Sequence, residues 1–252
     1  MTDRERSEKE FHDHSYAEDT RHKAHRFYAI TAAGKAHYRD ELLLDVAGTR
    51  VLEYGCGAGS RAFLLARRGA EVIGVDISEV AIRLAREEAE ARGVDGVRFE
   101  EMNAHQLTFP DDSFDLVCGS AILHHLDLDA ALAEIARVLR PGGRAVFYEP
   151  LGHNPIINWY RNRTPDLRTP DEQPLLEADL ARAEQWFESS EYRSFHLATL
   201  AALPFRRFPG FRGMVRFLDG VDRLLFRLVP PLRKHAWVVV LTLTGPRRET
   251  SS

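Results

Sequence analysis

Short apolar runs alternate with segments of helical periodicity between about residue 50 and residue 150. The runs have the length of strands, and the segments between them indicate amphipathic helices. This alternation is typical of βαβ units, in which helices cover both faces of a mostly parallel sheet. The pattern predicts strands at 50–54, 71–76, 97–101, 114–119 and 144–149, and helices at 60–68, 79–91 and 129–139, with "RPGG" as a helix stop and turn.

The pattern changes on both sides of this region. Residues 1 to about 25 are highly polar and predict a frayed segment, whereas the stretch from Ala24 to Leu44 predicts one or two helices. After Pro150, a segment with four prolines predicts a long loop at the rim where open α/β sheets bind ligands. A helix at 176–188 and strands near 194–198 and at 236–244 complete the expected elements.

The loop "VLEYGCGAGS" follows the first predicted strand and carries Gly55, Gly57 and Gly59. Glycines between a strand and a helix let the backbone approach a ligand closely. The dinucleotide fingerprint spaces its glycines G-x-G-x-x-G, whereas here the spacing is G-x-G-x-G. Glu53, two residues before the first glycine, is a poor neighbour for a pyrophosphate and a good one for a cationic ligand. The loop therefore argues against NAD.

The glycine loop and three further sequence motifs resemble those of the class I S-adenosylmethionine-dependent methyltransferases, in the small-molecule branch described as methyltransferase type 11. The further motifs are "VIGVDIS", "MNAHQLTFPDDSFDLVCGSAILHHL" and "LAEIARVLRPGGRAVFYEP", and the resemblance covers residues 51–150. It implies a Rossmann-like α/β fold with a seven-stranded, mostly parallel sheet, its last strand antiparallel. We expect an N-terminal helical cap at 1–45, a cofactor-binding core at 46–150, and an acceptor-side insertion with the closing strands of the same domain at 151–252.

The resemblance also implies how S-adenosylmethionine is held. The three glycines lie along its methionine and ribose, Glu53 lies near its ammonium, and Asp76 accepts hydrogen bonds from the ribose hydroxyls. The alternative for Asp76 is an acid at a helix N-terminus, where Ser78 is already a plausible cap. An asparagine replaces the family's usual aspartate near the adenine. The expected cofactor contacts are Glu53, Gly55, Cys56, Gly57, Gly59, Asp76, Ile77, Asn103, Ala104 and Ser120.

The end of the fourth strand bears on the methyl acceptor. Enzymes that methylate nucleobase or amide nitrogens typically have "[DN]PP[YF]" there, and this chain has "CGSA". His124 and His125 follow, and histidine is the commonest general base. Either could instead cap a helix or bind the cofactor's carboxylate. We place His125 ahead of His124, with His153 as a further candidate.

We therefore expect methyl transfer to a small aromatic or lipophilic molecule, with a hydroxyl as the target. The alternatives are a carbon or amine acceptor, or a cofactor-binding scaffold that has lost transfer. We expect no metal site.

Charge is distributed unevenly along the chain. The net charge is −4, but eight basic and two acidic residues lie between 201 and 235. On a helix, Arg212, Arg216, Arg223 and Arg227 share one stripe. The apolar residues broadly opposite are Met214, Leu218, Val221, Leu225 and Leu228. This helix suits a cap on the sheet or on a partner in a homodimer, a lid over the acceptor, or peripheral membrane contact through Phe211 to Leu228. The acidic whole chain, with no recognisable nucleic-acid module, disfavours a nucleic-acid partner.

The cellular compartment follows from three features. No apolar run approaches the roughly 18 residues of a membrane span. The charged start "MTDRERSEKEFHDHSY" lacks the apolar stretch of a secretory signal, and the two cysteines, Cys56 and Cys118, are too few for a disulfide framework. We expect a cytoplasmic protein that is a monomer or a homodimer.

Overall fold

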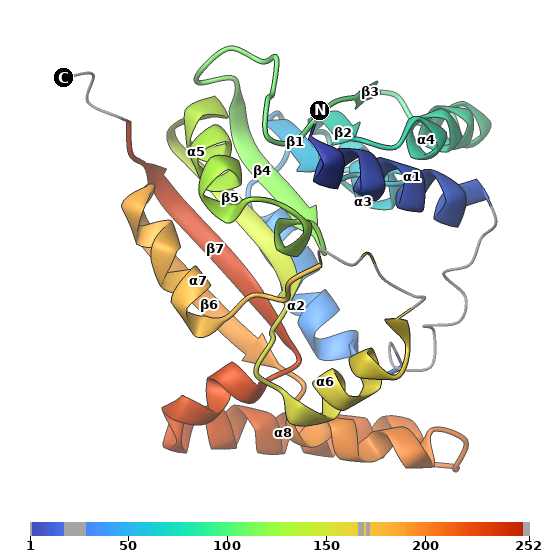
Figure 1. The fold of residues 1–252 in the computed structure, drawn as a ribbon, viewed down its shortest axis with the longest axis vertical. Helices are drawn as coiled ribbons and strands as arrows, with labels where there is room; N and C mark the ends of the chain where they lie inside the picture. The colour runs from blue at the N-terminus through green and yellow to red at the C-terminus, as the bar shows by residue number, and fades with distance from the viewer. Residues whose placement is uncertain (1, 18–28, 166–168, 170–171, 249–252) are drawn as a thin grey trace.

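The computed structural model describes residues 2–17, 29–165, 169 and 172–248, and a seven-stranded sheet forms its centre (Figure 1). The strand order is β3-β2-β1-β4-β5-β7-β6. Strands β1 to β5 are parallel, and β7 pairs antiparallel with both β5 and β6. The predicted fold class is therefore confirmed. The strands are β1 (Arg50–Tyr54), β2 (Glu71–Asp76), β3 (Val97–Glu101), β4 (Phe114–Ser120), β5 (Leu139–Pro150), β6 (Phe187–Phe195) and β7 (Val238–Pro246).

Helices cover both faces of the sheet, because alternate residues of the central strands point to opposite sides. Val51 of β1 belongs to a core shared with helices α2, α3 and α4, whereas Leu52 belongs to a core shared with α5 and α7. Both side chains are fully buried. The helices are α2 (Ala32–Leu43), α3 (Ser60–Ala66), α4 (Glu79–Arg92), α5 (Leu128–Val138) and α7 (Glu177–Arg182).

The predicted core elements agree with this arrangement to within a few residues, with two exceptions. The predicted turn "RPGG" lies inside β5, which begins at Leu139 and has an irregular register opposite Phe114 and Leu116. The predicted helix at 176–188 is wrong beyond residue 185. It ends as α7 and a short 3-10 turn, η4 (Ala183–Gln185), and β6 begins at Phe187 rather than near 194.

The polar N-terminus was expected to be frayed, and that expectation is wrong for helix α1 (Asp3–Ala17). Polar contacts rather than a broad apolar face hold α1 against the core. Asn103 Nδ2 donates to Glu5 Oε1 at 2.8 Å, Ser78 Oγ lies 2.5 Å from Asp13 Oδ1, and Lys9 pairs with Glu101. In the next segment, α2 confirms a predicted helix, and residues 18–28 lie outside the described part of the chain.

A further layer lies across one end of the sheet (Figure 1). It consists of α6 (Pro155–Asn162), the 3-10 helix η5 (Ala198–Phe205), α8 (Phe211–Leu228) and the 3-10 helix η6 (Pro230–His235). A small core that includes Ile30, Ile157, Leu200 and Val215 joins α6, η5 and α8. No helix in the described ranges is long and apolar enough to span a membrane.

Candidate active site

A cavity of about 1080 Å³ opens at the carboxyl ends of β1, β2, β4 and β5. The strand order reverses between β1 and β4, and open α/β sheets bind ligands at such a point. The cavity is at the upper end of the size range for small-molecule sites, so it has room for a cofactor and an acceptor together. The predicted residues that line it are Gly55, Cys56, Gly57, Asp76, Ile77, Asn103, Ala104, Ser120, His124 and His125.

The glycine loop has the backbone conformation that its sequence predicts. Gly55 and Gly57 have φ values of 69° and 52°, which favour glycine. A Cβ at Gly55 would lie 2.7 Å from Cγ1 of Ile122, so a larger residue would displace that side chain. Gly59 differs from these two because it does not line the cavity, and a Cβ there would meet the ring of Phe99. Gly59 therefore serves the packing of α3.

Glu53 lies behind the loop rather than in the cavity wall, and its side chain is almost fully buried. Its Oε2 accepts a hydrogen bond from the backbone N of Ala62 in α3 at 2.8 Å. Its Oε1 lies 3.9 Å from Arg61 and has no hydrogen-bond partner among the described residues. Burial raises the pKa of Glu53 to about 7, against the lowering effect of Arg61 and Ala62.

Asp76 joins two loops at the cavity. Its carboxylate accepts hydrogen bonds from the backbone N of Gly57 at 2.8 Å and of Ser78 at 2.9 Å. Ser78 is the N-cap of α4, since its Oγ accepts from Ala81 N at 3.1 Å. Each carboxylate oxygen of Asp76 can accept a further hydrogen bond, so both structural and ligand-binding roles fit this position.

Asn103 is held by α1 and by its own loop. Its Nδ2 donates to Glu5, and its Oδ1 accepts from the backbone N of His105 at 3.0 Å. The side chain of Asn103, expected near the adenine, is thus already hydrogen-bonded through both its nitrogen and its oxygen. The hydrogen bond from Asn103 contributes most to lowering the pKa of Glu5, to about 2. Next in the chain, the carbonyl of Ala104 accepts from the buried hydroxyl of Tyr54.

His124 is paired with a buried carboxylate. Its Nδ1 lies 2.7 Å from Oε2 of Glu149, and its Nε2 lies 3.7 Å from Oε1 of Glu172. Glu149 is fully buried, and its other oxygen accepts from the backbone N of Ile122 at 2.9 Å and of Leu123 at 3.1 Å. Glu149 therefore fixes both the loop that carries His124 and the ring itself.

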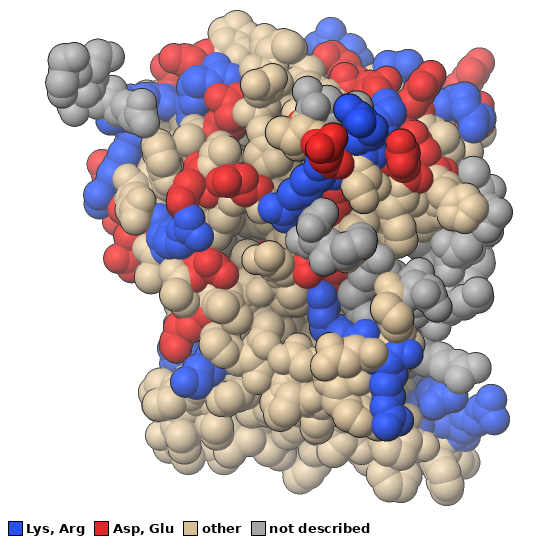
Figure 2. Space-filling model, in the orientation of Figure 1, with Lys and Arg blue, Asp and Glu red and all other residues tan. Residues whose placement is uncertain are grey.

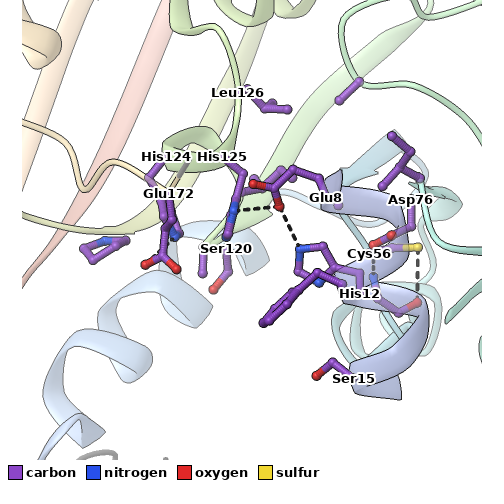
Figure 3. A pocket seen from close by; sticks show the side chains of 18 of the residues that line it. Glu8, His12, Ser15, Cys56, Asp76, Ser120, His124, His125, Leu126 and Glu172 are labelled. Atoms are coloured by element: carbon purple, nitrogen blue, oxygen red, sulfur yellow. Dashed lines mark hydrogen bonds and ion pairs between the residues drawn. The ribbon is translucent and has the colours of Figure 1, made fainter. Parts of the chain in front are cut away.

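His125 faces α1 instead. Figure 3 shows Glu8 between the rings of His125 and His12, and Oε2 of Glu8 lies 3.1 Å from His125 Nδ1 and 3.4 Å from His12 Nε2. Burial lowers the pKa of His125, although Glu8 opposes this. His153 does not line the cavity, and its Nε2 accepts from the backbone N of Glu177 at 3.2 Å.

Two sets of side chains place potential metal ligands within 4.8 Å of one another. One set is Glu8, His12 and His125, and the other is His124, His125 and Glu172. The sequence predicted no such site, because the residues come from separate segments of the chain. Each histidine in these sets has a carboxylate oxygen within 4.0 Å, and these contacts bring the side chains together without an ion.

Comparisons with known proteins identify the family. A methyltransferase domain model matches residues 52–147. The aklanonic acid methyltransferase DauC of Streptomyces sp. (strain C5) is 36% identical over 157 residues, which cover 60% of this chain and 68% of that protein. The chain belongs to the S-adenosylmethionine-dependent methyltransferases.

Two further comparisons with this methyltransferase match different shares of the other protein's length. The fatty-acid O-methyltransferase of Mycolicibacterium smegmatis is 31% identical over 197 residues, which cover 77% of this chain and 60% of that enzyme. The crystal structure of YcgJ from Bacillus subtilis matches with a TM-score of 0.55 at 23% identity, over 85% of this chain and 99% of that one, which shows a shared fold. The chain spans about half the length of several curated relatives that it matches.

The residues of the methyltransferase cavity fit S-adenosylmethionine. Behind the cavity wall, the buried Oε1 of Glu53 lacks a hydrogen-bond partner in the described structure and lies 3.9 Å from Arg61, so this carboxylate can add negative charge behind the glycine loop. Gly55 and Gly57 leave the loop without side chains where a ligand would approach. Asp76 retains acceptor capacity next to them.

The three carboxylates that lie beside His124 and His125 were not predicted from the sequence: Glu8, Glu149 and Glu172. Glu149 lies near the carboxyl end of a strand that was predicted, so its position at the ligand-binding edge was available as a signal. Glu8 lies on a helix with no pronounced apolar stripe, and Glu172 lies in a proline-rich segment. Neither pattern marks a residue that faces a cavity.

Proposed function

We propose that this methyltransferase transfers a methyl group from S-adenosylmethionine to a hydroxyl of a small lipophilic or aromatic molecule, with His124 as the general base. The observation that carries this proposal is the buried pair of His124 and Glu149 at the cavity. A carboxylate bound at Nδ1 favours the proton on that nitrogen and leaves Nε2 able to accept one. This ranking differs from the sequence-based one, which placed His125 first.

The bound cofactor supplies a methyl group that is already activated by its sulfonium charge. In the proposal, Glu53 and the loop at Gly55 and Gly57 hold its amino-acid end, and Asp76 receives its ribose hydroxyls. Cys56, Ile77, Ala104 and Ser120 line its path, with Asn103 near the adenine. The remaining task of the chain is to align the acceptor and remove its proton, which is general-base work.

The lining of the cavity supports a lipophilic acceptor. Its apolar side chains include Phe11, Ile122, Leu126, Ile157 and Trp237. The names of two relatives point the same way, since one acts on fatty acids and the other on aklanonic acid. A carbon or amine acceptor is the alternative within the same family, and it gives the histidine–carboxylate pair a smaller part in the reaction.

We also propose the setting in which the enzyme works. The free, buried Cys56 and Cys118 support a reducing compartment such as the cytoplasm. The division into a cap at 1–45, a core at 46–150 and an acceptor-side region at 151–252 remains part of the proposal, as does a monomeric or homodimeric state. Peripheral membrane contact through Phe211–Leu228 is supported by the composition of that helix.

The test is turnover with labelled cofactor. The purified protein is incubated with S-adenosylmethionine labelled in its methyl group and with a panel of lipophilic phenols, alcohols and amines. We expect label in the hydroxyl compounds and none in matched methyl ethers, which have no proton to lose. Cofactor binding without transfer to any member would instead favour a non-catalytic scaffold.

A further inference from the structure

Helix α8 turns a stripe of large apolar side chains outward. Phe217, Leu224 and Leu228 are 71%, 57% and 68% exposed. At about 100° per residue, they fall within about 40° of one another around the helix. The packed side of α8 is centred on Val215 and Phe226, which are buried. The sequence placed Leu228 broadly opposite the arginine stripe, and in the structure it lies on the exposed side of the helix.

Neighbouring elements extend the exposed apolar surface. The large exposed side chains beside α8 are Phe205, Phe208 and Val229, and α6 adds Ile156 and Trp159. We call these residues, with the stripe of α8, the end face. Figure 2 shows that the end of the molecule formed by α8 is largely uncharged in this view, with basic side chains at its margins. Exposed apolar surface of this extent marks an interaction site.

The charges of α8 are sorted between its two sides. Arg212, Arg216, Arg223 and Arg227 are exposed, and none forms an ion pair with any residue that the structure describes. The two acids of the helix point inward. Asp222 is buried and accepts from the backbone N of Ala198 at 2.6 Å, and Asp219 Oδ1 lies 3.3 Å from Thr199 Oγ1. The outer surface of α8 is therefore apolar and cationic.

This combination selects one kind of partner. A second copy that paired its α8 antiparallel to this one about a twofold axis would place the two arginine rows on the same side, because such an interface uses the same patch on both subunits. A bilayer with anionic headgroups instead accepts the aromatic and leucine side chains and attracts the arginines. The charge and the apolar stripe are thus both complemented by an anionic phospholipid surface.

The end face is also connected to the cavity. On α6, Ile157, Tyr160 and Arg161 line the cavity, while Ile156 and Trp159 are exposed on the end face. The same helix thus forms a wall of the cavity and part of the outer surface. A molecule anchored in a bilayer would meet the acceptor side of the cavity along this helix.

We propose that the end face docks the enzyme on anionic phospholipid membranes and that the acceptor is a membrane-resident amphiphile that reaches the cavity along α6. The substrate part rests on the proposed function, whereas the docking part does not. The two are therefore tested separately.

Docking is tested by sedimentation with phosphatidylcholine vesicles, with and without a minor fraction of phosphatidylglycerol. We expect pelleting only with phosphatidylglycerol, and less of it as salt is raised. Changing Arg212, Arg216, Arg223 and Arg227 together to Gln is expected to weaken vesicle partitioning by about 100-fold or more. Phe217→Asp alone is also expected to weaken vesicle partitioning. Because Phe217 is exposed, this substitution should not disturb the fold. A matched control changes four exposed arginines elsewhere to Gln: Arg39, Arg67, Arg68 and Arg83.

The outcomes separate the docking from the reaction. Equal pelleting with both vesicle types would overturn the docking. The docking would also be overturned if the control variant reduced pelleting and the α8 variants did not. A dimer in light scattering that Phe217→Asp converts to a monomer would also overturn it, in favour of a second copy. The α8 variants are expected to methylate a water-soluble acceptor as the wild type does and to lose at least tenfold in rate on the same acceptor group carried by a vesicle-bound lipid. If the α8 variants methylate the vesicle-bound acceptor as fast as the wild type does, the substrate part is overturned. A wild type that binds vesicles but transfers no methyl group would contradict only the proposed function.

Discussion

Nδ1 of His124 lies 2.7 Å from a carboxylate oxygen of Glu149, and both side chains are buried. The carboxylate is held in turn by two backbone N–H groups of the loop that carries the histidine. Glu149 thus fixes the ring orientation and favours a proton on Nδ1.

Replacing Glu149 tests this positioning role. We expect Glu149→Gln to lower kcat by about 100-fold, within the range attributed to general-base catalysis, because the amide no longer favours the reactive tautomer. The Kd for the cofactor should change less than twofold, as measured by calorimetry. His153→Ala is the matched control, since that ring lies outside the cavity lining. Equal losses in kcat and in cofactor binding would indicate a role in folding the loop instead.

Cofactor affinity is expected to depend on the ionisation of Glu53. Burial raises the pKa of Glu53 to about 7, so the carboxyl is mostly protonated at pH 6 and mostly charged at pH 8. Only the charged form attracts an ammonium group, so the Kd for S-adenosylmethionine should fall by roughly tenfold between those values. Glu53→Gln should bind more weakly and with a flat pH profile. A profile for the variant as steep as that of the wild type would rule out Glu53 as its source.

Helix α1 is expected to close the cofactor site. Its Glu5 accepts a hydrogen bond from Asn103, the residue proposed to lie near the adenine, and its Asp13 contacts Ser78, the N-cap of α4. Asp13→Ala combined with Glu5→Ala should increase hydrogen exchange in α1 and raise the Kd for the cofactor by about fivefold. The two substitutions remove contacts that hold α1 over the site, so docking the helix becomes less favourable. Arg6→Ala, on an exposed side of the same helix, serves as the control. Unchanged exchange in α1 would show that other contacts hold it.

Acid stability should depend on His196, whose side chain is buried and whose ring nitrogens lack hydrogen-bond partners in the described structure. Burial and the charge of Lys35 lower the pKa of His196 to about 4 from 6.5. The unfolded chain therefore binds the proton first, and the free energy of unfolding should decrease as pH falls from 6.5 to 4. The expected loss is about 3 kcal/mol. Urea titrations of the wild type and of His196→Asn should converge in that window, and parallel curves would contradict the assignment.

The core of the fold could be predicted because its signals are local. Strands such as Glu71–Asp76 and helices such as Glu79–Arg92 show their own periodicity, and the cap Ser78 marks a boundary. The predicted helix at 176–188 fails for the opposite reason. Leu180, Ala183 and Phe187 have helical spacing, but Phe187 is buried as the first residue of β6, where pairing with β7 decides the structure. Helix α1 was missed because contacts with distant residues stabilise it.

In the candidate site, too, features with a local sequence signal could be predicted, and features that depend on distant residues could not. Gly55, Gly57, Asp76 and the two adjacent histidines were found because they follow strand ends in a recognisable order. The ranking of His125 over His124 could not be judged from the sequence. The carboxylates that distinguish the two rings are Glu149, at the end of β5, and Glu8, on the N-terminal helix α1, and both are distant in sequence. Pairing across the fold decides which ring is oriented as a base.

The most direct test of the central claim is to locate the labelled methyl group in the product by mass spectrometry and NMR, for the wild type and for His124→Ala. The account predicts label on an oxygen with the wild-type enzyme, and a loss of at least 100-fold in turnover with His124→Ala while cofactor affinity is retained. Label on carbon or nitrogen, or oxygen labelling at an undiminished rate by His124→Ala, would contradict it.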